Sequence, residues 1–311
     1  MNKSTSLVGM GQKATKEKRD MAICFVLFNP AQTKRILMNY FYVKNLFVSQ
    51  NLPVFTLELV YEGQKPQVPD AFHVFTKSIM FHKENLCRIL ETKIPPQYKK
   101  LAFLDADIYF SDASWYNKTS ELLNSYDVVQ PFERAHWLDL TYKKTMLTRK
   151  TILLNTKKEW DYAYHPGFAW CMTRKWYKKQ GYFDYALSGS GDTLSSAAWL
   201  QKTFPANFQS LPNPLVSKYI TYRRQTPPRI TYLNDTDLYH LYHGSRENRQ
   251  YAERHKMLNT SGEIDEHIEE NKDGVFEWKD TAKWNPLYLQ YFKKRDDDGL
   301  SALEHDKKLT S

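Results

Sequence analysis

Cysteine is scarce in this sequence of 311 residues, and its three copies are far apart. Cys24, Cys87 and Cys171 each lie in an apolar stretch. This pattern excludes a disulfide framework and indicates reduced, structural thiols, which favours a cytoplasmic site of action. The motifs Cys-x-x-Cys and His-Glu-x-x-His are also absent, so neither a structural zinc site nor a zincin site is predicted.

Long apolar runs are lacking as well. None approaches the ~20 residues that a membrane span needs, so no transmembrane segment is expected. The first twenty residues are polar and basic and contain no apolar core of a signal peptide, so we interpret residues 1–20 as a disordered basic segment. A Walker A loop is absent, and no Gly-x-Gly-x-x-Gly follows the first apolar run. Kinase and dinucleotide-binding functions therefore lose support.

Charge is distributed unevenly along the chain. Residues 261–311 hold 13 acidic and 8 basic residues, a net charge of −5, whereas the whole chain carries +9 and residues 1–260 therefore +14. A basic body suits a nucleic acid, an anionic membrane or a phosphorylated small molecule. Because Lys and Arg are spread along the sequence and not clustered, a solvated basic surface is the competing interpretation.

Apolar runs alternate with segments of helical periodicity in the first hundred residues. The pattern predicts strands at Met21–Phe28, 53–60, 72–75 and Lys100–Leu104, and helices at 31–50 and 81–90. Such alternation favours an α/β fold with an open, mostly parallel sheet and helices on both faces. Ligands bind beyond the carboxyl ends of the strands of such sheets. Asn29, Glu62 and Asp105 each follow a predicted strand and are expected at that edge.

The second half of the chain shows a weaker pattern. Residues 133–164 are rich in Arg, Lys, Trp and Tyr without a clear period, and we interpret them as an insertion over the sheet edge on the acceptor side. We predict an edge strand at 127–130, an apolar segment at 167–172, helices at 176–179, 192–200 and 247–258, and a late strand at 238–242. Asp192 is the expected N-cap of its helix. The predicted domain spans 21–258, and 259–311 is an acidic extension, partly docked or disordered.

The most informative motif is Asp105-Ala106-Asp107, which closes an apolar run at 101–104. Two carboxylates one residue apart at the end of a buried strand suit Mn²⁺ or Mg²⁺ carrying a diphosphate. The sequence contains two further Asp-x-Asp pairs, Asp235/Asp237 and Asp296/Asp298. Only the first pair follows a run typical of a buried strand, so it is the predicted metal site.

Four segments in order carry a resemblance to a known family. They are 81–83 (Phe-His-Lys), 103–107, 165–170 leading to Gly189-Ser-Gly-Asp192, and 243–249. Together they resemble inverting glycosyltransferases of the GT-A (Rossmann-like) fold, above all the β-1,4-galactosyltransferase type and related bacterial and large-virus sugar transferases. The resemblance covers about residues 21–258.

The resemblance implies a role for several residues. Asp107 and His243 would hold Mn²⁺, with Asp105 on the metal or the donor ribose. Lys83 would contact the donor nucleotide, Asp192 would be the catalytic base, and Gly167 and Trp170 would line the sugar pocket. The candidate donor-binding residues are thus Phe28, Asn29, Glu62, Lys83, Asp105, Ala106 and Trp170. His165 and Trp137 are candidates on the acceptor side.

The chain departs from the family pattern at one important point. The galactosyltransferase type carries an acidic pair before its base helix, whereas Gly191 precedes Asp192 here. One acid would then do the work. The chemistry itself is coherent, because a cation neutralises the departing diphosphate and a carboxylate accepts the proton of the attacking hydroxyl.

The leading hypothesis is therefore a metal-dependent, inverting glycosyltransferase. It would use a nucleoside-diphosphate sugar, expected to be UDP-linked, and a hydroxyl of a glycan or other acceptor. A retaining transferase of the same fold is the nearest alternative. A nucleic-acid-binding protein is suggested by the basic body, but no RNA-recognition signature or basic helix supports it. A non-catalytic carbohydrate-binding module would not need Asp105, Asp107 and His243 together.

Overall fold

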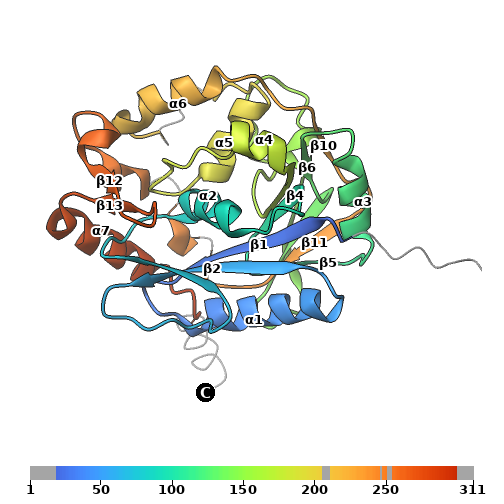
Figure 1. Ribbon diagram of the computed structural model, residues 1–311, viewed down its shortest axis with the longest axis horizontal. Helices are drawn as coiled ribbons and strands as arrows, with labels where there is room; N and C mark the ends of the chain where they lie inside the picture. Colours follow the sequence, from blue (N-terminus) through green and yellow to red (C-terminus); the bar gives the residue numbers. More distant parts are fainter. Residues whose placement is uncertain (1–18, 205–210, 246, 251–253, 300–311) are drawn as a thin grey trace, which may run out of the picture.

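A sheet of seven strands forms the centre of the molecule. The computed structural model describes residues 19–204, 211–245, 247–250 and 254–299. Within this part of the chain the strand order is β10-β6-β9-β4-β1-β2-β3 (Figure 1). Their bounds are β1 Met21–Phe28, β2 Val54–Tyr61, β3 Phe72–Thr76, β4 Lys100–Leu104, β6 Val128–Gln130, β9 Ala169–Thr173 and β10 Ile230–Tyr232. Neighbouring strands are parallel, except that β9 runs antiparallel to β4 and β6.

Helices cover both faces of this sheet because its inner strands are apolar on both sides. In β1, Ala22 and Cys24 belong to one hydrophobic cluster, whereas Ile23 and Phe25 belong to another. The first cluster includes residues of α2 (Lys83–Lys93), α4 (Arg174–Lys179), α5 (Gly191–Trp199) and α6 (Val216–Arg223). The second includes residues of α1 (Lys34–Ser49) and α3 (Trp115–Leu122) (Figure 1). The predicted α/β, Rossmann-like architecture is confirmed.

A second sheet lies beside the end of the first and replaces the irregular insertion that the sequence predicted. It has the order β5-β11-β7-β8, with β5 Ile108–Phe110, β11 Asp237–His240, β7 Arg134–Leu138 and β8 Thr145–Lys150. The antiparallel pair β7-β8 is formed by the segment that showed no period. Its strand β8 is mostly exposed, which is why it lacks the apolar alternation of a half-buried strand. The strand predicted at 127–130 is present as β6, but its predicted position at the sheet edge was wrong, because β6 pairs with β10 on one side and with β9 on the other.

The helices predicted in the second half need two corrections. The helix α5 begins at Gly191, and its N-cap is Ser190, whose φ is 68°, so Asp192 lies in the first turn and is not the cap. The predicted helix 247–258 is present only as short 3-10 turns at Glu247–Arg249 and Arg254–Leu258, within the described part of that segment. Among the described helices, every one is too short or too polar to cross a membrane.

The acidic segment after residue 258 is folded as far as the structure describes it. It contains the 3-10 turn Ile264–Glu266, the antiparallel pair β12 (Ile268–Glu270) and β13 (Phe276–Trp278), and the helix α7 (Thr281–Lys294). Trp278, Trp284 and Tyr288 are buried in the same hydrophobic cluster as α2. The indole of Trp278 donates a hydrogen bond to the carbonyl of Ile79 at 2.9 Å. Residues 1–18 and 300–311 lie outside the described residues.

Candidate active site

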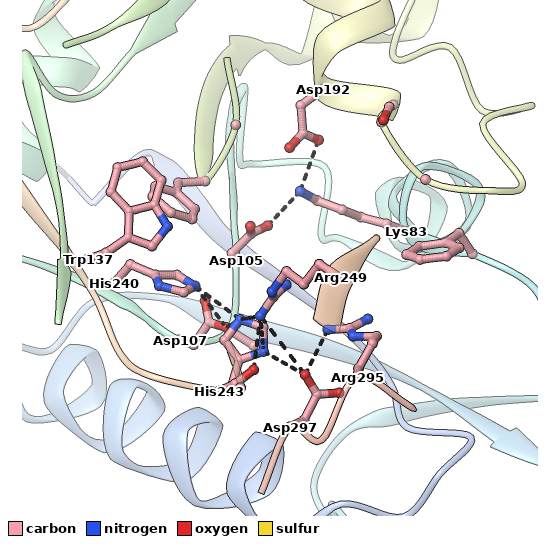
Figure 2. A pocket seen from close by; sticks show the side chains of 18 of the residues that line it. Lys83, Asp105, Asp107, Trp137, Asp192, His240, His243, Arg249, Arg295 and Asp297 are labelled. Atoms are coloured by element: carbon pink, nitrogen blue, oxygen red, sulfur yellow. Dashed lines mark hydrogen bonds and ion pairs between the residues drawn. The ribbon is translucent and has the colours of Figure 1, made fainter. Parts of the chain in front are cut away.

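A cavity of about 1080 Å³ lies at the carboxyl ends of β1 and β4, where sheets of this class bind ligands. The central sheet contributes Phe28, Asn29 and the Asp105–Asp107 turn to its wall. The helices, the second sheet and the C-terminal segment complete the lining, and Figure 2 shows this convergence. Of the three residues expected at the strand ends, Asn29 and Asp105 line the cavity. Glu62, although it follows β2, is exposed and not among the lining residues.

Asp107, His240 and His243 form a compact cluster on one side of the cavity (Figure 2). Asp107 Oδ2 lies 2.9 Å from His243 Nε2 and 3.6 Å from His240 Nε2, and the two Nε2 atoms are 3.0 Å apart. The backbone holds these residues together, because Leu241 N donates to the Asp107 carbonyl at 2.8 Å. The sequence predicted Asp107 and His243 but missed His240, the last residue of β11.

The donor atoms of this cluster fit a divalent cation. Asp107 Oδ1 is buried and has no hydrogen-bond partner among the described residues, which is costly unless a cation or another donor meets it. Burial alone would raise the pKa of Asp107, but the interactions of its carboxylate with His240, His243 and Arg249 outweigh burial and hold this pKa well below its usual range. Burial lowers the pKa of His240 to about 3, so its imidazole is neutral and able to act as a ligand. Two imidazoles and one carboxylate suit Mn²⁺ better than Mg²⁺, which prefers oxygen.

A second cluster lies across the cavity and is centred on Lys83. Its Nζ is 2.6 Å from Asp105 Oδ1 and 3.1 Å from Asp192 Oδ1, so one ammonium bridges two carboxylates (Figure 2). Burial would lower the pKa of Lys83, but Asp105 and Asp192 raise it well above its usual value. Burial raises the pKa of Asp105 to about 6, although Lys83 opposes the shift.

This second cluster bears on the roles predicted for Asp105 and Lys83. The Asp105 carboxylate turns to Lys83 and does not join the group of Asp107, His240 and His243, because Asp105 and Asp107 are separated by one residue in a turn and their side chains point to different partners. Lys83 lines the cavity, and its ammonium lies between the carboxylates of Asp105 and Asp192. Its contact with the donor nucleotide stays a prediction.

Asp192 reaches the cavity from the first turn of α5. Its carboxylate packs against Gly167, where a Cβ atom would come within 2.4 Å of Asp192 Oδ2. Only a glycine therefore leaves Asp192 this position. A similar contact occurs at Gly191, the residue before Asp192, where a Cβ atom would lie 2.1 Å from the carboxylate of Glu84. Burial, followed by the charge of Asp192, raises the pKa of Glu84 to about 8.

Trp170 is not part of the cavity wall, contrary to the prediction. It is 2% exposed, packs edge-on against Trp199 at 5.1 Å between ring centroids, and donates from its indole to the Pro166 carbonyl at 2.8 Å. In the register of β4 and β9, Trp170 lies opposite Phe103, and both residues belong to the core cluster beneath α2, α4 and α5. Trp170 is therefore a core residue.

Other aromatic residues line the cavity on the side of the second sheet. The ring centroid of Trp137 lies 4.7 Å from the ring centroid of His165 and 4.9 Å from that of Phe168. Phe168 in turn stacks on His240 at 4.5 Å with an interplanar angle of 17°. Further along, the half-exposed Tyr162 extends the same wall. Trp137 and His165, the two residues expected on the acceptor side, are thus both at the cavity.

Basic and C-terminal residues complete the lining, and the sequence pattern singled out few of them. Arg249 Nη2 donates to the His243 carbonyl at 3.0 Å and lies 2.7 Å from both ring nitrogens of His243. Asp297, which is 2% exposed, lies 3.2 Å from the Nδ1 atom of His243. The basic lining residues besides Lys83 are Arg149, Arg249, Arg254, Lys256 and Arg295.

No protein-family model and no curated protein matches the sequence. Among solved structures, the chain is similar to Drosophila beta-1,4-galactosyltransferase 7 in complex with manganese, UDP-Gal and xylobiose. The identity is 12%, the match covers 86% of this chain and 98% of that chain, and the TM-score is 0.40. It is also similar to glucosyl-3-phosphoglycerate synthase from Mycobacterium tuberculosis in complex with Mg²⁺ and uridine-diphosphate, at 11% identity, 77% and 76% coverage and a TM-score of 0.36. A third similar structure is a glycosyltransferase involved in glycosylation of the major capsid of PBCV-1, at 12% identity, 87% and 98% coverage and a TM-score of 0.28. With TM-scores below 0.5, these similarities do not assign an activity to the chain.

Proposed function

We propose that this protein is a metal-dependent, inverting glycosyltransferase that uses a nucleoside-diphosphate sugar, UDP-linked, and a hydroxyl of a glycan acceptor. The observation that carries the proposal is the pairing of two sites in one cavity. A cluster of Asp107, His240 and His243 with an unpaired carboxylate oxygen lies on one side, and the Asp192 carboxylate lies on the other. A leaving diphosphate needs a cation to neutralise its charge, and an acceptor hydroxyl needs a carboxylate to take its proton.

The donor would bind between β1 and the cation cluster. Asp107, His240 and His243 would hold Mn²⁺, which when bound supplies positive charge to the diphosphate. Arg249 lies beside the cluster and adds fixed positive charge where phosphate oxygens would arrive. Phe28, Asn29 and Ala106 line the remaining wall at the strand ends, where the nucleoside would fit.

Asp192 would accept the proton of the acceptor hydroxyl. Its Oδ1 is engaged by Lys83, and its Oδ2 faces Gly167 at the cavity wall. Lys83 holds the carboxylate in one orientation and supports its negative charge before the proton arrives. The attacking oxygen would form its bond to the anomeric carbon as the bond to the diphosphate breaks, and Asp192 would take the proton. An α-linked donor would thus give a β-linked product.

The acceptor would lie along the wall made by Trp137, Tyr162 and His165. Flat aromatic faces at a polar cavity suit the C–H faces of sugar rings, and their exposed edges leave the hydroxyls solvated. This wall comes from the second sheet and the loop after it, whereas the donor residues come from the central sheet. Donor and acceptor would accordingly approach Asp192 from different sides.

A donor screen tests the proposal. Hydrolysis of a panel of nucleoside-diphosphate sugars by the purified protein should depend on Mn²⁺, and UDP-linked donors should be preferred. The alternative interpretation is that the cluster of Asp107, His240 and His243 binds no cation and is an ion-pair network around Arg249. A calorimetric titration with Mn²⁺ alone distinguishes this alternative from a cation site. Absence of both Mn²⁺ binding and donor hydrolysis would rule out the proposed activity.

A further inference from the structure

The acidic turn Asp296–Asp298 follows α7, and its middle residue reaches the proposed cation site. Asp297 Oδ1 is 3.2 Å from His243 Nδ1, and the same oxygen accepts a hydrogen bond from Arg295 Nη2 at 3.1 Å (Figure 2). With an exposed fraction of 2%, Asp297 is as buried as the core tryptophans. A carboxylate is buried in this way only when its charge has close partners.

The surrounding chain is built to hold this turn in place. We call residues 295–299 the C-terminal clasp. The backbone at Gly244 has a φ of +90°, and a Cβ atom there would come within 2.7 Å of the Arg295 carbonyl, so only glycine permits this approach. Next to it, Asp298 Oδ1 accepts a hydrogen bond from Arg35 N at 2.7 Å. Asp298 thus caps the first turn of α1, whose own N-cap Thr33 makes no side-chain cap.

We propose that Asp297 is a positioning residue of the cation site, and that the C-terminal clasp holds Asp297 in place there. Asp297 accepts the Nδ1–H of His243 and so selects the tautomer that carries its lone pair on Nε2. That lone pair then points at the space between Asp107 Oδ2 and His240 Nε2, at 2.9 and 3.0 Å. Carboxylate partners of this kind orient metal-binding histidines and raise their basicity. The inference rests on the proposed cation site.

The arrangement of charges supports this assignment. Arg249 Nη2 can only donate and lies 2.7 Å from both ring nitrogens of His243, so it does not distinguish between them. The two carboxylates do: Asp297 contacts Nδ1, whereas Asp107 lies 2.9 Å from Nε2 and would itself bind the cation. With a cation between Asp107 and Nε2, Asp297 is the group that can accept the proton of His243.

Calorimetric titration with MnCl₂ alone, without donor, tests the inference. Asp297→Asn keeps the size of the side chain but loses its charge, and its affinity for Mn²⁺ should fall by roughly 10- to 100-fold. Asp298→Asn is the matched control in the same clasp, because asparagine still caps α1. Its Mn²⁺ affinity should stay at the wild-type value. Equal affinity of wild type and Asp297→Asn would overturn the role of Asp297 and leave the cation site intact. A wild type that binds no Mn²⁺ would instead overturn the site itself.

NMR of the protein loaded with Zn²⁺, a diamagnetic substitute for Mn²⁺, gives a second measurement. The Nδ1–H proton of His243 should resonate far downfield, because it is donated to a carboxylate, and this resonance should move upfield in Asp297→Asn. An unchanged resonance in the variant would contradict the inference. A purely structural role of Asp297 would lower the melting temperature without moving the resonance.

Discussion

Glu84 occupies the space that a side chain at residue 191 would need. The carboxylate of this buried glutamate, in the first turn of α2, lies where a Cβ atom of Gly191 would approach it to 2.1 Å. In the pattern of the galactosyltransferase type that the sequence resembles, Gly191 stands in place of an acidic residue. In the structure, an acid from a different helix lies at that place, next to Asp192, at the wall of the cavity.

Gly191→Ala should destabilise the protein by about 1–3 kcal/mol, the usual cost of overpacking a tight contact. The strain arises because the new methyl group meets a buried carboxylate that is enclosed and cannot simply turn away. Urea unfolding of the variant measures the effect. In the double variant Gly191→Ala/Glu84→Ala, the methyl group meets no carboxylate, so the two substitutions should show a strong favourable coupling. Strict additivity of the two free-energy changes would contradict the contact.

Glu84 also predicts a pH dependence of stability. Burial and the charge of Asp192 raise its pKa from 4.5 to about 8, so the native state holds this proton more tightly than the unfolded state. The resulting contribution to stability is complete below pH 4.5 and is lost as the pH rises through about 8. Glu84→Gln stays neutral throughout. The difference in unfolding free energy between variant and wild type, measured in urea from pH 5 to 9, should therefore shift steadily in favour of the variant; a constant difference would exclude the raised pKa.

Lys83→Met should reduce kcat more than it changes the donor KM. Lys83 bridges Asp105 and Asp192, so its loss leaves Asp192 without its charge-assisted hydrogen bond, and two carboxylates face each other without a cation. Loss of such a bond costs about 1.5–3 kcal/mol, or roughly ten- to a hundredfold in rate. Steady-state kinetics with donor and acceptor varied separately measures this split. A pure increase in donor KM would instead support the predicted contact of Lys83 with the donor nucleotide.

Asp192→Asn tests the base directly, because asparagine preserves size but cannot accept the proton. Mn²⁺ and donor binding should survive, whereas transfer should fall by roughly 10²- to 10⁴-fold. The anomeric configuration of the wild-type product, determined by NMR, provides an independent check. Retention of configuration, or full activity of the variant, would exclude Asp192 as the base of an inverting reaction.

Trp170→Ala should act on stability and not on sugar recognition. The side chain is buried against Trp199 in the core, and truncating such a residue costs about 3–5 kcal/mol. Under conditions where the variant is still folded, its donor KM should equal that of the wild type. A selective loss of donor affinity at unchanged stability would return Trp170 to the sugar pocket.

The sequence predicted the framework of the site because local patterns determine it. Asp107 and Asp192 each adjoin a clear element, a buried strand and a helix start, and the rule for the strand ends brings Asp105 and Asn29 to one cavity. The error for Trp170 has a physical cause: the residue lies in a strand buried on both faces, where no alternation reveals its direction.

The residues that the sequence did not reveal are brought in by tertiary contacts. His240 offered a weak signal, because it forms a His-x-x-His spacing with the predicted ligand His243 at the end of a strand. Asp297 and Glu84 gave no signal in the sequence. Asp297 meets His243, and Glu84 meets Gly191, only because the fold brings together segments that are far apart in the sequence. The hairpin β7-β8 was missed for another reason, since its exposed strand lacks the apolar alternation on which the prediction rests.

The C-terminal clasp follows every described strand in the sequence, so the complete site can form only after those strands have been synthesised. The bond from Asp298 to Arg35 spans 263 residues, and the contact of Asp297 with His243 spans 54. During synthesis, His243 cannot be oriented until residue 297 has emerged and docked, long after the sheet strands are available. Loss of the clasp from the folded protein would likewise release His243 while the core stays intact. Cation affinity would then report whether the clasp is docked against His243.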